Sequence, residues 1–156
     1  MLHVVLVNPE IPPNTGNVGR LCVAVDATLH VVHPIPFQMD AKAVRRAGLD
    51  YWKHVRLVEH ADTDAFWSWA EGRRVHLFSS HGRASYLDCP YQDDDVLVFG
   101  RETVGLPREW VEERGGYHVP MAPGPIRSLN LGNAAAIVVY AAVARIRPPW
   151  FAPAGG

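Results

Sequence analysis

The 156-residue sequence is poor in the features that mark several common classes of protein. Its two cysteines, Cys22 and Cys89, are too few for a disulfide framework or a cysteine zinc site, and they favour a reducing cytoplasm. No apolar run approaches the ~20 residues of a membrane-spanning helix. The start, MLHVVLVNPE, lacks the basic segment and the cleavage site of a signal peptide. We therefore expect a globular cytoplasmic protein with no membrane partner.

An excess of charge of one sign is also lacking, because the formal net charge is −1. The overall charge thus does not indicate a nucleic-acid-binding protein, although a local basic face would be enough. All basic residues except Lys42 and Lys53 are arginines, whose planar guanidinium group suits phosphate recognition, but codon bias explains most of this excess. The histidines show no metal-binding spacing, so no metal site is predicted.

Asparagine is scarce and unevenly placed. The asparagines are at positions 8, 14, 17, 130 and 133, and none lies between Val18 and Leu129. Chance can produce such clustering in a small sample. The alternative, which we favour, is that the amides of these two short segments have a specific role.

Short apolar runs alternate with stretches of helical periodicity along the chain. The pattern predicts strands at residues 2–7, 29–33, 54–58, 75–79, 96–100 and 117–121. It predicts helices at residues 15–27, 40–48, 62–71, 107–114 and 130–146. This alternation predicts an α/β fold with a mostly parallel sheet flanked by helices. We expect a single domain over residues 1–148 and a C-terminal tail over residues 149–156.

The last predicted helix, NLGNAAAIVVYAAVARI, is apolar almost all the way round. Such a helix is buried on most of its sides. In a chain of this length, the first and last helices both have more apolar surface than one layer against a sheet can cover. A homodimer that buries the remaining faces would account for this pattern.

A first polar segment, NTGNVGR (14–20), opens the first predicted helix. Asn14 or Thr15 can cap this helix, and a strand, a glycine-bearing turn and a helix N-terminus together can bind an anion. Asn17 and Arg20 are three residues apart and so share a face. A capping turn with a surface arginine is the alternative, but the apolar residues that follow favour a functional Arg20.

Two further segments join predicted strands to predicted helices. FGRETVGLP (99–107) is neither GxGxxG nor GxxxxGK[ST], so it supports neither a dehydrogenase nor a P-loop nucleotide hydrolase. Its Gly100 permits close approach to a ligand or a positive φ, and Glu102 is either a ligand-site carboxylate or an ordinary solvated charge. In HVPMAPGPIRSLNLGNAAA (118–136), Ser128 or Asn130 can cap the last helix and still contact a ligand.

Together these segments resemble the motifs of the SPOUT class of RNA methyltransferases, in the branch that methylates the ribose 2′-hydroxyl. NTGNVGRLC is similar to motif 1, FGRETVGLP to motif 2 and VPMAPGPIRSLNLGNAAAIVVYAA to motif 3. With RRAGLDYW between them, the resemblance covers nearly the whole chain, without an appended RNA-binding domain. The loop APGPIRS is one residue longer than is usual, which would alter the shape of the methyl-donor pocket.

The resemblance implies a deep C-terminal trefoil knot, which is a rare exception among folds, and a homodimer with active sites at the subunit interface. It implies S-adenosylmethionine as methyl donor, with S-adenosylhomocysteine as product. The substrate would be tRNA-Leu, methylated at the wobble nucleotide 34 (C or modified U) of the anticodon loop. By position in the motifs, the donor-binding residues would be Phe78, Gly100, Val119, Met121, Ser128 and Leu129.

The catalytic positions of the family match Arg20, Asn14, Glu102, Ser128 and Asn130. The family mechanism makes Arg20 the base, but a guanidinium group essentially never deprotonates in a protein. We favour an Arg20 that binds the target phosphate and stabilises the developing alkoxide. Asn14 and Asn130 would then hold Arg20 or the ribose, and Glu102 would orient Arg20.

RNA contacts are expected at Arg20, Asn17, Arg45 and Arg46, while stacking of anticodon bases is expected on Tyr51 and Trp52. A solvated charged face is the ordinary alternative for the arginines. Two other functions stay open on the sequence alone. One is 2′-O-methylation of another tRNA or rRNA site, and the other is a non-catalytic, dimeric RNA-binding module on the same fold.

Overall fold

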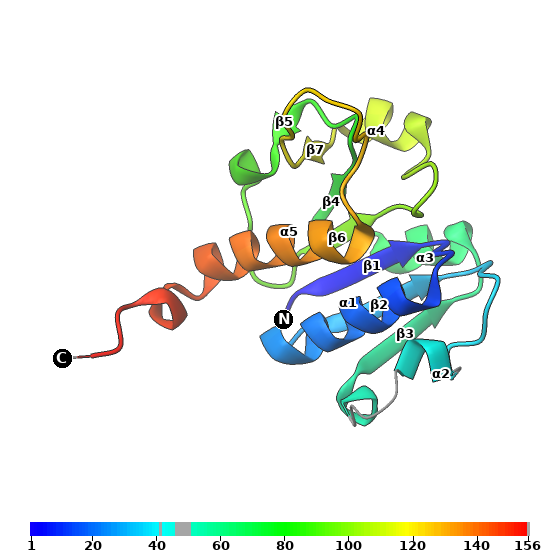
Figure 1. The fold of residues 1–156 in the computed structure, drawn as a ribbon, viewed down its shortest axis with the longest axis horizontal. Helices are drawn as coiled ribbons and strands as arrows, with labels where there is room; N and C mark the ends of the chain where they lie inside the picture. The colour runs from blue at the N-terminus through cyan, green and yellow to red at the C-terminus, as the bar shows by residue number, and fades with distance from the viewer. Residues whose placement is uncertain (41, 46–50, 156) are drawn as a thin grey trace.

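The computed structural model describes residues 1–40, 42–45 and 51–155, and strands and helices alternate along it as predicted (Figure 1). The strands are β1 (His3–Val7), β2 (Thr28–Val32), β3 (Arg56–His60), β4 (Val75–Phe78), β5 (Ala84–Ser85), β6 (Val96–Phe99) and β7 (Tyr117–His118). They form one sheet in the order β3-β2-β1-β6-β4-β7-β5. Each of these strand pairs is parallel, which confirms the predicted α/β fold.

Helices cover both faces of the sheet. They are α1 (Pro12–Val25), α2 (Lys42–Arg45), α3 (Thr63–Ala70), α4 (Arg108–Arg114) and α5 (Leu131–Ile146). Helices α1 and α5 pack on one face, and α3 and α4 on the other. None of the described helices is both long and apolar enough to cross a membrane.

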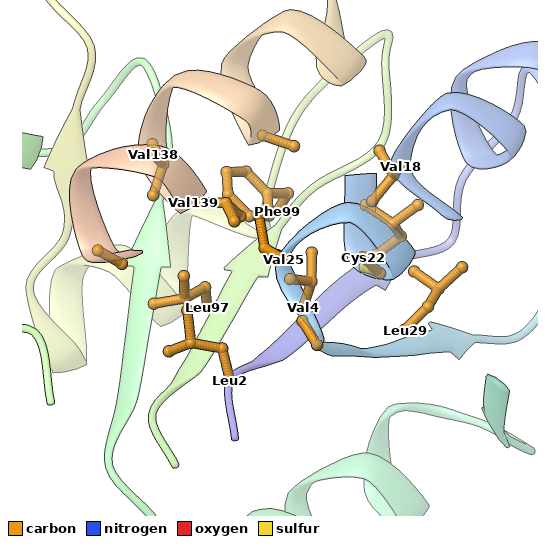
Figure 2. Close-up of a cluster of buried hydrophobic side chains, with 14 of the residues drawn as sticks. Leu2, Val4, Val18, Cys22, Val25, Leu29, Leu97, Phe99, Val138 and Val139 are labelled. Carbon is orange, nitrogen blue, oxygen red and sulfur yellow. The ribbon is translucent and has the colours of Figure 1, made fainter. Parts of the chain in front are cut away.

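The larger apolar core lies between the sheet and the pair α1 and α5. Figure 2 shows Val18 and Cys22 of α1 and Val138 of α5 on the same side of the sheet as Leu97 and Phe99 of β6. All five side chains are almost fully buried. Burial on both faces explains why the central strands read as nearly continuous Val and Leu runs rather than as alternating patterns.

Several predicted boundaries are wrong, and each error has a local cause. Helix α1 begins at Pro12 rather than residue 15, because prolines at the first helical positions cost no hydrogen bond. Strand β3 begins at Arg56 rather than residue 54, since residues 52–54 form a 3₁₀ turn. Strand β7 is only two residues long and β5 was not predicted, because such short strands carry too few residues for a pattern. Of the helix predicted at 40–48, residues 41 and 46–48 lie outside the described residues.

Helix α5 keeps an exposed apolar side in the single chain. Ile137 is 38% exposed and Tyr140 is 45% exposed, although the opposite side of the helix is fully buried in the core. On α1, Asn17, Arg20 and Ala24 are exposed. The expectation that these two helices have more apolar surface than one chain covers therefore holds for α5, whereas α1 exposes polar residues as well.

Candidate active site

The carboxyl ends of four parallel strands gather the three polar segments at one edge of the sheet. Strands β1, β6 and β4 are neighbours and point the same way, and β7 lies next to β4. The loops that follow them begin at Asn8, Gly100, Ser79 and Val119. Open α/β sheets bind ligands beyond the carboxyl ends of their strands. The topology therefore brings together segments that are more than a hundred residues apart in sequence.

A cavity of about 810 Å³ lies at this edge. Its volume is within the range of small-molecule sites, which is roughly 300–1,000 Å³. The six residues expected to bind a methyl donor all line it: Phe78, Gly100, Val119, Met121, Ser128 and Leu129. Of the residues expected to be catalytic, Asn14, Glu102, Ser128 and Asn130 line it as well. The structure thus brings together every predicted donor and catalytic position except Arg20.

Two asparagines from opposite ends of the chain are hydrogen-bonded at the cavity. The Nδ2 of Asn130 donates to the Oδ1 of Asn14 at 3.1 Å. Asn130 also caps α5, because its Oδ1 accepts from the backbone N–H of Asn133 at 3.2 Å. Asn14 is not a cap but lies in the first turn of α1, where Ile11 is the N-cap. The two segments that contain the asparagines therefore meet in space through Asn14 and Asn130.

Glu102 is hydrogen-bonded within the chain, so the alternative of an ordinary solvated charge is wrong. The expectation that Glu102 orients Arg20 stays a prediction, because Arg20 does not line this cavity in the single chain. The Oε2 of Glu102 accepts from the backbone N–H groups of Glu10 at 2.7 Å and Ile11 at 3.1 Å. Glu10 reciprocates, since its carboxylate accepts from the hydroxyl of Thr103 at 2.9 Å and from the Thr103 N–H at 3.2 Å. The two carboxylates thus join the loop after β1 to the loop after β6.

The second carboxylate oxygen of Glu102 accepts no hydrogen bond from the described residues, and we call it the open oxygen. This oxygen, Oε1, is buried. A buried carboxylate oxygen without a partner costs free energy, and such groups usually have a functional explanation. Because Glu102 lines the cavity, a small movement of its side chain would let a hydrogen-bond donor or a cation bound there reach this oxygen.

Gly100 is required by the tight fold of its own loop. A Cβ at this position would lie 2.1 Å from the carbonyl carbon of Gly105 and 2.1 Å from the nitrogen of Leu106. The loop closes through the Gly105 N–H, which donates to the Arg101 carbonyl at 2.9 Å, with Gly105 at φ +71°. The backbone of residues 100–105 therefore folds back tightly and presents itself along the cavity wall.

Arg20 and Asn17 lie on the exposed side of α1 and do not line the cavity. The guanidinium group of Arg20 is 5.9 Å from the ring centroid of Tyr51, whose hydroxyl donates to the Gly16 carbonyl at 3.0 Å. Trp52 packs so closely on α1 that a Cβ on Gly19 would lie 2.6 Å from its ring. Both aromatic rings are partly used in packing. Arg46, and the side chain of Arg45, lie outside what the structure describes.

Sequence reasoning missed several polar groups at this edge. Arg101 donates to the Oδ1 of Asn8 at 3.1 Å, and Arg101 was not singled out. Glu10 and Thr103 were also missed, although both lie in the loops that follow two neighbouring strands. The signal was their position after β1 and β6, but it is usable only once the order of the strands is known.

The chemistry of the cavity is that of hydrogen bonding and charge. It offers two amides, one partly satisfied carboxylate, the guanidinium groups of Arg101 and Arg127, and the backbone of three loops. Burial, together with the neighbouring Cys89 thiol, raises the pKa of Tyr117, which lines the cavity, so its phenol stays protonated. Over the part of the chain that is described, no group of three or more His, Cys, Asp or Glu residues could hold a metal ion.

A cavity of this kind at the carboxyl edge of a parallel sheet is a small-molecule site of an α/β enzyme. The chain belongs to the SpoU rRNA methylase family, whose pattern matches residues 1–140. This membership confirms the resemblance of the three motifs to ribose methyltransferases of the SPOUT class. The knot itself stays a prediction.

The chain is similar over nearly its whole length to enzymes and structures of known type. A relative from Escherichia coli K12, a tRNA (cytidine(34)-2'-O)-methyltransferase, is 41% identical over 145 residues, covering 91% of this chain and 92% of the relative. A solved structure that concerns the 2-OH methylation of C/U34 on tRNA is 42% identical with a TM-score of 0.87, over 93% of this chain and 95% of that one.

A more distant structure adds a ligand. An AdoMet-bound rRNA methyltransferase from Sinorhizobium meliloti is 26% identical with a TM-score of 0.82. The likeness covers 92% of this chain and 56% of that one, so the two share this unit and the other protein is longer. AdoMet is S-adenosylmethionine, the donor that the motifs imply.

Proposed function

We propose that this protein transfers a methyl group from S-adenosylmethionine to the ribose 2′-oxygen of nucleotide 34 (C or modified U) in the anticodon loop of tRNA, with tRNA-Leu as substrate. The observation that carries the proposal is the cavity, which joins all the predicted donor residues to four predicted catalytic residues. The tRNA-modifying relative at 41% identity over 91% of this chain supports the choice of nucleotide.

The cavity suits the donor in size and in chemistry. Its volume of about 810 Å³ accommodates a molecule of several rings and chains. Phe78, Val119, Met121 and Leu129 offer apolar contact for an adenine ring, and the backbone of residues 100–105 offers hydrogen bonds. The open Oε1 of Glu102 suits a cation or a hydrogen-bond donor. When bound, S-adenosylmethionine supplies an electrophilic methyl group on a sulfonium, and S-adenosylhomocysteine is the product.

The residues of the chain then act on the ribose and its phosphate. Asn14 and Asn130 hold the ribose through the amide atoms that their mutual hydrogen bond leaves free. Ser128 lines the cavity two residues before Asn130 and offers a hydroxyl to the same group. Arg20 stays charged, binds the target phosphate and stabilises the alkoxide that develops on the 2′-oxygen. The proton passes to the phosphate or to water.

A homodimer explains the position of Arg20. In one chain Arg20 is exposed on α1 and does not line the cavity, while α5 keeps Ile137 and Tyr140 exposed beside it on the same face of the sheet. A second copy that covers this surface brings Arg20 of one subunit to the cavity of the other. The active site would then lie at the subunit interface.

A single domain over residues 1–148 with a tail over 149–156 is part of the same proposal.

The test is transfer of a labelled methyl group from S-adenosylmethionine to tRNA-Leu transcripts, with the modified nucleotide mapped by mass. Wild type is compared with Arg20→Ala after gel filtration of both. A 2′-O-methyl group at nucleotide 34 that disappears in the variant supports substrate, chemistry and residue together. Transfer to another tRNA or to rRNA, and not to tRNA-Leu, would show that the substrate is a different RNA. RNA binding that persists without donor binding would leave a non-catalytic RNA-binding module as the function.

A further inference from the structure

A second, smaller cavity of about 290 Å³ adjoins the main one. The two cavities share four residues of their walls: His81, Arg101, Val104 and Gly105. The small cavity extends from this shared wall to Asn8 at the end of β1 and to Arg108 at the start of α4. Its volume is below the lower limit of about 300 Å³ for ordinary small-molecule sites, so it suits one compact group rather than a nucleoside.

The polar side chains that line the small cavity are two guanidinium groups, an imidazole and an amide. His81, Arg101 and Arg108 line it together with Asn8, and no acidic side chain of the described residues lines it. The main cavity differs, because the acidic Glu102 lines it together with Arg101 and Arg127, so charges of both signs are present there. The small cavity has Arg101 and Arg108 without a carboxylate among its described lining residues, so it suits an anion better than the main cavity does.

The guanidinium group of Arg101 is held in place before any ligand arrives. Its Nη2 donates to the Oδ1 of Asn8 at 3.1 Å, and Asn8 is itself anchored through its Nδ2 to the carbonyls of Val32 at 3.2 Å and Pro34 at 3.3 Å. Glu10 lies 3.9 Å from the Nη1 of Arg101 but does not line the cavity, and its carboxylate is already bonded to Thr103. A fixed guanidinium group loses less entropy when it binds.

Arg108 supplies the second guanidinium group. It is exposed, and no hydrogen bond or ion pair joins its side chain to another residue in the described ranges. Two guanidinium groups on one compact cavity match the geometry of a phosphate group, whose oxygens accept paired hydrogen bonds. The overall net charge of −1 shows that this positive site is local.

We propose that the small cavity binds a phosphodiester group of the RNA next to the nucleotide whose ribose occupies the main cavity. This inference rests on the proposed function. The shared wall of His81 and Arg101 is where a nucleotide chain would pass from one cavity to the other. The phosphate fixes the position of the chain, and with it the reach of the 2′-oxygen, without reading the base.

The first test is the salt dependence of tRNA-Leu binding by Arg108→Ala, with Arg114→Ala as a matched control. Arg114 is at the other end of α4, where it lies 4.0 Å from the Trp67 ring centroid. We expect Arg108→Ala to weaken binding ~3- to 10-fold and to lower the slope of log K against log salt by about 0.7–0.9. Arg114→Ala keeps the wild-type slope. An unchanged slope in Arg108→Ala, or an equal change in the control, would overturn the inference.

A second test identifies the phosphate. Each phosphodiester that flanks nucleotide 34 is replaced in turn by a neutral methylphosphonate in a synthetic anticodon stem-loop. One replacement should weaken binding by wild type as much as Arg108→Ala does, and should have no further effect in Arg108→Ala. Additive losses at both positions would contradict the proposal.

The same variants separate this inference from its rivals. If Arg108→Ala weakens S-adenosylmethionine binding instead, the small cavity takes the carboxylate of the donor and the inference is wrong. If millimolar inorganic phosphate does not compete with tRNA-Leu for wild type, and Arg108→Ala keeps the wild-type salt slope, the small cavity is not a phosphate site. If wild type methylates nucleotide 34 but Arg108→Ala keeps the wild-type salt slope, the phosphate subsite is wrong and the proposed function stands. If wild type binds no tRNA, both proposals are wrong.

Discussion

Two polar clusters lie on this sheet, and they differ in whether their hydrogen bonds are completed within the chain. On the face covered by α3, the imidazoles of His3, His30 and His60 form a row across β1, β2 and β3. At the carboxyl edge, the amides and carboxylates of the cavity keep open atoms. A cluster that is complete contributes to stability, whereas one that stays open needs something from outside the chain.

The hydrogen bonds of the histidine row are completed within the chain. His3 Nδ1 and His30 Nε2 are 2.9 Å apart, His30 Nδ1 and His60 Nε2 are 3.0 Å apart, and His3 Nε2 lies 3.1 Å from Asp94 Oδ1. Three neutral rings that each carry the proton on Nε2 make every one of these contacts, with Asp94 accepting the last proton. Trp69 covers all three rings. Burial, and then the neighbouring His3 and His60, lower the pKa of His30 to about 3.

The cavity cluster is arranged differently, although it also contains hydrogen-bonded pairs. Asn14 and Asn130 bond to each other at 3.1 Å, and Glu102 accepts two backbone N–H groups through one oxygen only. The other oxygen of Glu102 is buried without a partner among the described residues. These contacts fix the groups in position but leave some of their atoms free. The contrast predicts that substitutions at the cavity mainly affect activity and that substitutions in the row mainly affect stability.

The largest expected effect is that of Asn130→Ser on methyl transfer. Serine keeps the N-cap of α5 but lacks the amide that donates to Asn14. We expect kcat to fall about 10²–10³-fold, as when one fixed donor is removed from a reacting centre, with a nearly unchanged melting temperature. Steady-state transfer to tRNA and thermal unfolding measure both. A large loss of melting temperature with full activity would reverse the roles of the two clusters.

Glu102→Gln should produce the next largest effect. The glutamine oxygen can still accept from the N–H groups of Glu10 and Ile11, while its NH₂ replaces the open oxygen. We expect activity to fall roughly tenfold or more with little change in stability, because only the open side of the group changes. Glu102→Ala removes both sides and should also lower the free energy of unfolding by about 1–3 kcal/mol. Equal activity in Glu102→Gln and wild type would show that the open oxygen has no function.

His30→Leu tests the complete cluster through its pH dependence. Because the folded pKa is about 3 and the unfolded value is 6.5, the unfolded state binds more protons between these values. The stability from a neutral His30 is therefore fully present above pH 6.5 and is lost as pH falls toward 3. In His30→Leu, denaturant unfolding should show lower stability at neutral pH but a smaller dependence on pH over this window. A variant profile parallel to that of wild type would mean that other groups set the acid sensitivity.

The smallest expected effect is that of Thr103→Val. The substitution removes the hydroxyl that donates to Glu10 at 2.9 Å and keeps the backbone N–H that donates at 3.2 Å. Thr103 is exposed, so the loss should be about 0.5–1.5 kcal/mol of unfolding free energy or less. Donor affinity, measured by calorimetry, should fall slightly because the loop over residues 100–105 is less firmly held. A loss of affinity as large as that of Glu102→Ala would make Glu10 and Thr103 part of the binding site itself.

The sequence was a good guide to the parallel sheet and to the residues of the cavity, for physical reasons that differ. Long Val and Leu runs that alternate with helices indicate buried parallel strands without further information. The cavity residues were identified through their motifs, and the pattern of asparagines pointed independently to Asn14 and Asn130. The pairing of Glu102 with Glu10 and Ile11 could not be predicted, because it depends on β1 and β6 being neighbours although about ninety residues separate them.

For Arg20, sequence reasoning predicted a proximity that the single chain does not show. Its place three residues after Asn17 in motif 1 suggested that it would meet the other catalytic residues. In one chain it does not, because α1 turns it to the exposed side while Asn14 faces the cavity. Helical periodicity alone could have indicated this separation, since residues six apart do not share a face. Under the proposed function, the group that completes the site comes from a second copy of the chain.

Subunit mixing tests most directly the claim that the open cluster is completed by a second copy. Heterodimers are purified through two different tags, one subunit with Arg20→Ala and the other with Asn130→Ser, each of which is expected to be inactive as a homodimer. If Arg20 acts on the cavity of the other subunit, the heterodimer contains one intact site of two and should regain about half of the wild-type transfer rate. A heterodimer as inactive as both parents would mean that each site uses its own Arg20, which contradicts completion of the cavity by a second copy.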